Sequence, residues 1–226
     1  MIRQGILRVL AASAALSPVA GPAAAHPHVF VDAEIVFRLG EGGALEALRV
    51  TWAFDAFYSM LLLAEMGMDP VAAPDAAALA ALAALQPDWA RDFGGAGAAR
   101  YDEAEIALAP AEAVSAEVAD GRLRIAFDRP LAAPVDPSAG AVLAEVYDPT
   151  FFVAYSMLEA PRVEGPGAED CSAVLRPFAP NQETDALQSA LMALGMDETP
   201  ETPQVGRVFA DSAALTCRAR APRAAP

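Results

Sequence analysis

The sequence predicts an α+β protein built mainly from antiparallel β-strands, with an N-terminal β-hairpin and two or three packed helices. Two neighbouring segments of alternating apolar residues, 29–39 and 45–54, flank a glycine-rich loop. Short strand-like runs dominate the rest of the chain, whereas helical spacing of apolar residues occurs in only a few segments. Strands joined by short turns pair antiparallel, so these observations favour a mostly antiparallel sheet.

Residues 1–25 have the features of a secretory signal peptide. Arg3 and Arg8 supply positive charge, an apolar stretch follows, and Ala23–Ala25 is a small-residue cleavage motif. Charged and proline residues interrupt the apolar stretch, which is too short to cross a bilayer, since a span needs about 20 consecutive apolar residues. We therefore expect an exported, periplasmic protein that begins at His26 and has no stable membrane insertion.

The predicted hairpin leads directly into a helix. The loop between its two strands is expected at residues 40–43, where three of the four residues are glycine. Asp55 is a good N-cap, and apolar residues recur at helical spacing from Phe57 to Met68. The sequence therefore predicts that a helix starts at Asp55.

Later elements follow from the same kinds of pattern. An alanine-rich helix is expected over 74–85, before Pro87, and another helix over 184–194 with Thr184 as its N-cap. A Gly/Ala loop is expected at 94–99. Strands are expected at 104–108, 123–127, 142–147, 151–158, 171–175 and 207–217.

Length, charge and cysteine content indicate one exported domain over 26–217, followed by a disordered tail over 218–226. The formal net charge is −15 and all 15 basic residues are arginine. Such acidity disfavours binding to nucleic acid or to anionic membranes, which attract basic surfaces. In an exported chain the two cysteines, Cys171 and Cys217, are most simply one disulfide. The alternative, a cysteine metal site, lacks the paired spacing of zinc ligands.

The two histidines of the chain, His26 and His28, stand at the start of the predicted mature protein. On an extended strand residues i and i+2 point to the same side, about 6–7 Å apart, so both imidazoles can reach one ion. Cleavage after Ala25 adds the α-amine of His26 as a third nitrogen donor. These donors suit zinc first, with nickel, cobalt and copper as alternatives. Pro27 has no amide hydrogen, so a copper or nickel site made with deprotonated backbone amides is incomplete.

The hairpin supplies a candidate oxygen ligand. With a regular register across the 40–43 loop, His28 lies opposite Asp55, which could complete the site or orient the imidazole. Asp32 shares that face but lies about 13 Å along the strand from His28. Asp32 and Asp148 are candidates for a supporting role around the ligands. The structural alternative is that Asp55 only caps the helix and that the histidines form a surface feature without a ligand.

Three classes of function remain open. The first is a non-enzymatic metal-binding protein, which we expect. The second is a binding protein for an organic solute or a protein partner, in which the histidines only order the N-terminal strand. The third is a copper-dependent oxidative enzyme with an N-terminal histidine brace, although such a site takes its second histidine from a distant segment and the sequence has none. No histidine remains to act as a base for serine or cysteine.

Three segments resemble a bacterial family called domain of unknown function 1007. They are His-Pro-His-Val-Phe-Val-Asp-Ala at 26–33, Val-Thr-Trp-Ala-Phe-Asp-Ala-Phe-Tyr-Ser at 50–59 and Val-Tyr-Asp-Pro-Thr-Phe-Phe-Val-Ala at 146–154, and the cysteine pair also fits. The resemblance implies a periplasmic component of an uncharacterised transport system. Members of that family are similar to proteins found beside or fused to nickel/cobalt exporter-type permeases and zinc uptake genes. The resemblance therefore implies metal handling, with an inner-membrane metal permease as partner.

Overall fold

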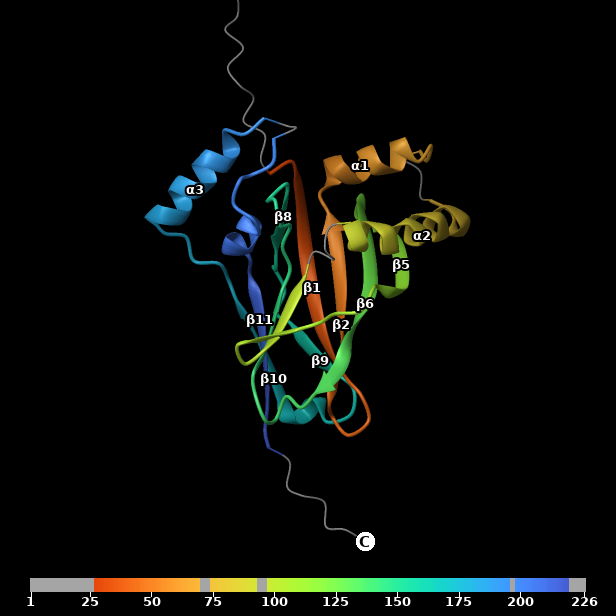
Figure 1. Cartoon of the computed structure of the whole chain (residues 1–226). Helices are drawn as coiled ribbons and strands as arrows, with labels where there is room; N and C mark the ends of the chain where they lie inside the picture. Colours follow the sequence, from red (N-terminus) through yellow and green to blue (C-terminus); the bar gives the residue numbers. More distant parts are fainter. Residues whose placement is uncertain (1–26, 70–73, 93–96, 196–197, 220–226) are drawn as a thin grey trace, which may run out of the picture.

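Two β-sheets and three α-helices make up the part of the chain that the structure describes. The computed structural model describes residues 27–69, 74–92, 97–195 and 198–219. Both sheets are mostly antiparallel, and the helices gather at one end of the molecule (Figure 1). The predicted α+β class is confirmed.

The first sheet contains the predicted hairpin and has the strand order β5-β6-β2-β1-β8, with β9 pairing to the far end of β1. Its antiparallel pairs are β1 with β2, β2 with β6, and β5 with β6, whereas β8 and β9 run parallel to β1. The strands are β1 Val29–Leu39, β2 Leu45–Phe54, β5 Glu112–Ala119, β6 Arg122–Val135, β8 Val153–Ser156 and β9 Arg162–Glu164.

The second sheet has the order β10-β11-β7-β3-β4, and all its pairs are antiparallel. Its strands are β3 Ala98–Tyr101, β4 Ala104–Ile106, β7 Val142–Glu145, β10 Cys171–Arg176 and β11 Ser212–Cys217. Cys171 and Cys217 are ladder partners and form a disulfide, which confirms the predicted bond.

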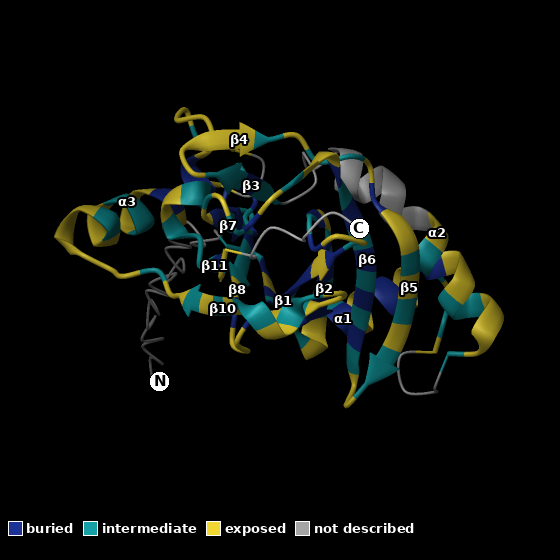
Figure 2. Cartoon of the chain, turned by 90° about the horizontal axis from the view of Figure 1, so that it is seen from below, coloured by how far each residue is buried: buried dark blue, intermediate teal, exposed yellow. Residues whose placement is uncertain are grey.

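The core lies between the two sheets, where buried residues gather in the view from below (Figure 2). Every second residue of β1 is buried, as the alternation predicts for a half-buried strand. Trp52, Phe37 and Phe127 are the largest fully buried side chains, and the Trp52 ring meets Phe127 edge-on at 4.8 Å. All three belong to the first sheet and lie in a core cluster that also contains buried residues of the second sheet.

The helices confirm some boundaries and correct others. α1 is Ala56–Glu65 with Asp55 as its N-cap, as predicted. α2 is Ala76–Asp92, so it continues past Pro87, where the prediction ended it. Proline removes one helical hydrogen bond at a cost of about 3 kcal/mol, which disfavours but does not forbid a helix.

The third helix, α3, is Gln182–Met192 and its N-cap is Asn181 rather than the predicted Thr184. The Asn181 side chain accepts from the Thr184 backbone N–H at 3.0 Å, and the Thr184 hydroxyl accepts from the Asn181 N–H at 2.8 Å. Thr184 is therefore the second member of a capping box. Two 3-10 helices complete the fold, η1 at Ala168–Asp170 and η2 at Val205–Phe209.

Some strands differ from the prediction because pairing, not local pattern, decides them. The expected Gly/Ala loop at 94–99 overlaps β3, and the expected strand over 207–217 is divided between η2 and β11. β5 and β9 were not predicted. Arg218, the first residue of the predicted tail, donates its backbone N–H to the carbonyl of Asp170 at 2.9 Å, and residues 220–226 lie outside the described ranges.

Candidate functional site

His28 lies immediately before β1, at the edge where β8 joins the first sheet. Its backbone N–H donates to the carbonyl of Phe152 at 2.9 Å, and its imidazole contacts the Phe152 ring with 4.5 Å between centroids. His26, the other predicted histidine ligand, and the predicted cleavage site before it lie outside the described residues. The structure therefore places one of the two imidazoles and shows which segment holds it.

The segment that holds His28 is shaped by Asp148. This carboxylate is almost fully buried, with 3% exposed, and one of its oxygens accepts from both the backbone N–H and the hydroxyl of Thr150, each at 2.9 Å. The other oxygen accepts from the Val153 N–H at 2.9 Å. Asp148 thus closes the turn that carries Phe152. Because Asp148 binds the turn and the turn places Phe152 against His28, any effect of Asp148 on the position of His28 acts through Phe152.

The predicted pairing of His28 with Asp55 is wrong by two residues. Val31 pairs with Phe54, so the residue opposite Asp55 is Phe30. The Asp55 N–H donates to the Phe30 carbonyl at 2.9 Å, and the Phe30 N–H donates to Oδ2 of Asp55 at 3.2 Å.

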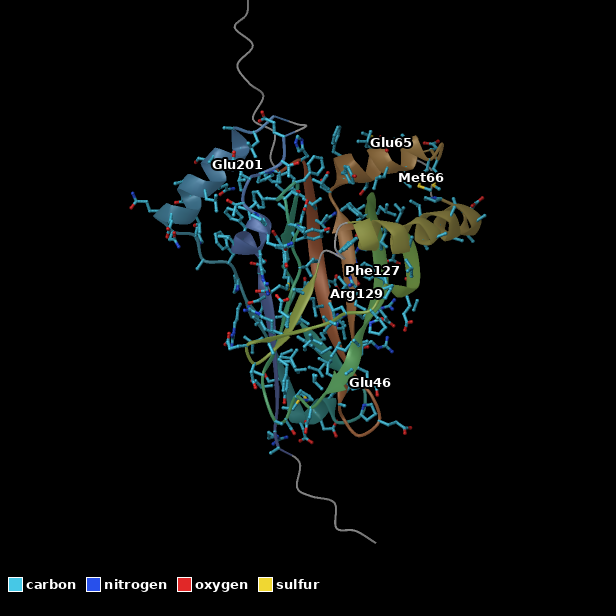
Figure 3. The ribbon with its side chains drawn as sticks, viewed as in Figure 1. Glu46, Glu65, Met66, Phe127, Arg129 and Glu201 are labelled. Atoms are coloured by element: carbon cyan, nitrogen blue, oxygen red, sulfur yellow. A yellow bond between two sulfur atoms is a disulfide. The ribbon has the colours of Figure 1, made fainter. Side chains whose placement is uncertain are left out.

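Two one-residue shifts near the hairpin loop add up to this slip. The first lies in the loop, where Leu39 pairs with Leu45 and not with Ala44, its partner across a regular 40–43 loop. The second is a β-bulge. Arg38 pairs with Ala47, whereas the next residue, Leu39, pairs with Leu45. Glu46 is therefore an extra residue on β2 without a partner on β1, and it displaces the whole ladder beyond it. Figure 3 shows Glu46 near the hairpin end, far from α1.

The slip keeps His28 and Asp55 at the same end of the sheet. An even displacement keeps His28 on the same face of the ladder as Asp55, because side chains alternate with a period of two. His28 then becomes a diagonal neighbour of Asp55, a relation that corresponds to about 7–8 Å between Cα atoms in a regular ladder.

Asp55 has structural contacts and retains acceptor capacity. Its Oδ1 accepts from the Tyr58 backbone N–H at 2.8 Å, which is the N-cap bond of α1, and its Oδ2 accepts from Phe30. A carboxylate offers about four lone-pair positions, so two hydrogen bonds leave room for a further ligand. Asp55 is therefore able to cap the helix and to bind a cation at the same time.

Asp32 is directed toward β6 rather than toward His28. Its Oδ2 lies 2.5 Å from Nη1 of Arg122, which also donates to the carbonyls of Ala53 and Phe54 at 2.7 Å each. Arg122 therefore ties Asp32 to the end of β2, directly before Asp55. In the described structure Asp32 holds the strand that positions Asp55.

Two tyrosines pack against aromatic residues of β2. The Tyr155 ring lies 5.6 Å from Trp52, and the Tyr58 ring lies 5.6 Å from Phe54. Burial raises the pKa of Tyr155, and the negative charge of Asp148 raises it further. Burial also raises the pKa of Tyr58, with additional contributions from Glu65 and Asp55. Both phenols therefore stay neutral at neutral pH.

The buried tyrosine predicts a loss of stability in alkali. Tyrosine in an unfolded chain ionises near pH 10, whereas native Tyr155 stays protonated above that pH, so the folded state binds more protons there. Its contribution to stability is complete below pH 10 and falls above it by up to about 1.4 kcal/mol per pH unit. Urea unfolding at pH 8, 10 and 11 measures this loss.

The chain has no lysine and both cysteines are in the disulfide, but the pKa values of Tyr58, Tyr101 and Tyr147 are also raised, so a variant is needed to isolate Tyr155. The Tyr155→Phe variant should lose less stability than the wild type between pH 10 and 11. Equal losses in the two proteins would contradict the assignment to Tyr155.

No helix of the described segments has the length and apolarity that a membrane crossing requires. Within those segments, no three His, Cys, Asp or Glu side chains are grouped closely enough to hold a metal ion. The predicted ligand set includes His26 as its third side chain, and that residue is not described. The Cys171–Cys217 disulfide is compatible with a secreted protein.

The contact between Phe152 and His28 was not predicted from the sequence. It depends on parallel pairing between β1 and β8, which lie more than 100 residues apart in the chain. The one signal for it was the resemblance of the 146–154 segment to a family block. In a comparison with family models, the model described as Protein of unknown function (DUF1007) matches residues 10–217. The comparisons with curated proteins and with solved structures find no match.

Proposed function

The chain belongs to the DUF1007 family, and from this premise we propose that it is a periplasmic, non-catalytic protein that binds a divalent transition metal. The proposed ligands are His26, His28 and Asp55. Zinc is the first candidate metal, and nickel, cobalt and copper are the alternatives. The protein would serve an inner-membrane metal permease.

One observation carries the proposal: His28 lies two residues before Phe30, the residue that faces Asp55 at the end of the hairpin, and Asp55 is fixed there by α1 and Phe30. His26 lies two positions before His28 in the sequence, within the reach of the same ion if that segment is extended. Zinc binds imidazole nitrogen and carboxylate oxygen at about 2.0–2.2 Å, so it needs side chains that converge from neighbouring positions.

The proposed mechanism is capture followed by release to the permease. Two imidazoles and one carboxylate leave a coordination position open for a ligand of the acceptor, since zinc prefers four ligands. Phe152 and Asp148 fix His28 from one side, and the helix cap fixes Asp55 from the other. A site with so few protein ligands and an open position favours moderate affinity and exchange.

Metal titration of the exported protein tests the proposal. The N-terminus is first determined by mass spectrometry, and Zn²⁺, Ni²⁺ and Cu²⁺ are then titrated by calorimetry. We expect His28→Ala to weaken binding by at least about tenfold, because even residues that only support metal ligands account for 10–100-fold. Unchanged affinity in the double variant His26→Ala/His28→Ala would contradict the metal proposal and favour histidines that only order the strand.

A matched pair of variants separates the two roles of Asp55. Asparagine is as good an N-cap as aspartate, so Asp55→Asn should keep the stability of α1 while it weakens metal binding. Asp55→Ala should lower both, with a loss of about 1 kcal/mol in the free energy of unfolding. One residue added before His26 isolates the contribution of the α-amine. Wild-type metal affinity in Asp55→Asn would remove this carboxylate from the ligand set.

A further inference from the structure

Beside the proposed metal site, α1 presents large apolar side chains to solvent. Phe57, Met60 and Leu61 are 71%, 46% and 41% exposed, and their spacing places them on one side of the helix. Phe30 is 55% exposed on the adjoining strand and is held beside the helix by its two hydrogen bonds with Asp55. We call these four residues the apolar face.

The apolar face is not a loosely packed part of the core, because the opposite side of α1 is firmly seated. Ser59 is fully buried, and its hydroxyl donates to the Asp55 carbonyl at 2.7 Å and accepts from the Leu123 N–H at 2.9 Å. Leu62 and Leu63 are buried in the core. The helix therefore cannot turn its exposed side inward without breaking these contacts.

The stretch of sequence that contains α1 carries only negative charge, and Arg122, the basic residue bonded to the end of β2, is paired with Asp32. Between Thr51 and Ala90 the chain has five acidic residues and no basic one. Asp55 stands at the start of α1 and Glu65 at its end, where Figure 3 labels it. A surface of this kind is complementary to a partner that combines apolar and basic side chains.

We propose that the apolar face docks an amphipathic, basic segment of a partner protein. Its four exposed side chains amount to roughly 400 Å² of apolar surface, at on the order of 200 Å² for a fully exposed aromatic residue. A stable dimer usually needs about 800 Å² on each subunit, so the area fits a transient partner better than a second copy. The net charge of −15 also opposes self-association and anionic lipid. The inference rests on the proposed function only in naming the metal permease as the protein that carries this segment.

Peptide binding to the metal-free exported protein tests the surface directly. Three synthetic amphipathic peptides serve as probes, each with leucine on one face and with lysine, glutamine or glutamate on the other. We expect the lysine peptide to bind most tightly in fluorescence anisotropy. We expect Phe57→Gln/Met60→Gln to weaken its binding by at least about tenfold, the effect of losing two central apolar contacts.

A control variant, Val174→Gln/Val208→Gln, changes two exposed apolar residues on β10 and η2 and should bind the lysine peptide like the wild type. Equal binding of the glutamate peptide, or unchanged binding by Phe57→Gln/Met60→Gln, would overturn the proposal. So would tighter binding to vesicles of phosphatidylethanolamine and phosphatidylglycerol, or a dimer that the Phe57→Gln/Met60→Gln variant abolishes. Metal binding is not required here, so its failure in the calorimetric titration would leave this result standing.

Discussion

Replacing Asp148 with alanine is expected to lower the free energy of unfolding by about 3–4 kcal/mol. The change removes three hydrogen bonds to a charged acceptor and leaves the N–H groups of Thr150 and Val153 buried without it. The turn cannot open to recruit water easily, because Gly206 lies against it: a Cβ on Gly206 would stand 1.8 Å from the Asp148 carbonyl oxygen. Chemical denaturation of the exported protein measures the loss.

Asp148→Asn is the matched control for this prediction. Its single acceptor oxygen can keep the bonds to Thr150, while its amide group faces the Val153 N–H and cannot accept from it, so a loss of about 1–2 kcal/mol is expected. Hydrogen exchange at the His28 amide should speed up in both variants, because Phe152 is no longer held in place. A stable Asp148→Ala protein with wild-type exchange at His28 would show that the turn does not depend on this carboxylate.

Removing the disulfide is expected to cost about as much. Cys171 and Cys217 are 46 residues apart in the sequence, and closing a loop of that size restricts the unfolded chain by about 3–4 kcal/mol. The double variant Cys171→Ser/Cys217→Ser should therefore unfold at much lower urea concentration than the wild type. The midpoint and slope of the urea transition give the difference in free energy.

Reductant supplies the control for that variant. It should lower the stability of the wild-type protein to that of Cys171→Ser/Cys217→Ser and should leave the variant unchanged. The β10–β11 ladder continues for several residues beyond the cysteines, so the native sheet is expected to persist at low urea concentration. A variant that matches the oxidised wild type within about 1 kcal/mol would contradict a stabilising role for the disulfide.

Elements governed by near neighbours in the chain were predicted well. The bounds of β1 and β2 match the alternating segments 29–39 and 45–54, and Asp55 caps α1 as expected. A strand with one buried face alternates over its whole length, and an N-cap bond spans only three residues. Such information is complete within a short window of sequence.

Elements governed by distant partners were predicted poorly or not at all. β5 alternates, with Val114, Ala116 and Val118 packed against the core, but its small apolar residues make a weak local signal, and β6 supplies its hydrogen-bonding partners. β9 has three residues and pairs in parallel with the end of β1. The alternation over 114–118 was therefore a signal that the prediction missed, whereas a three-residue strand such as β9 has no recognisable pattern of its own.

The candidate site was likewise predictable only in part. By itself the sequence determined that both histidines stand beside the first strand, that Asp55 lies where the hairpin meets α1, and that two cysteines are available to pair. Only the tertiary structure decided that Phe30 faces Asp55 and that Phe152 holds His28. The physical reason is that strand register depends on how the hairpin loop closes and on one unpaired residue at Glu46, and parallel pairing depends on segments that meet only after folding.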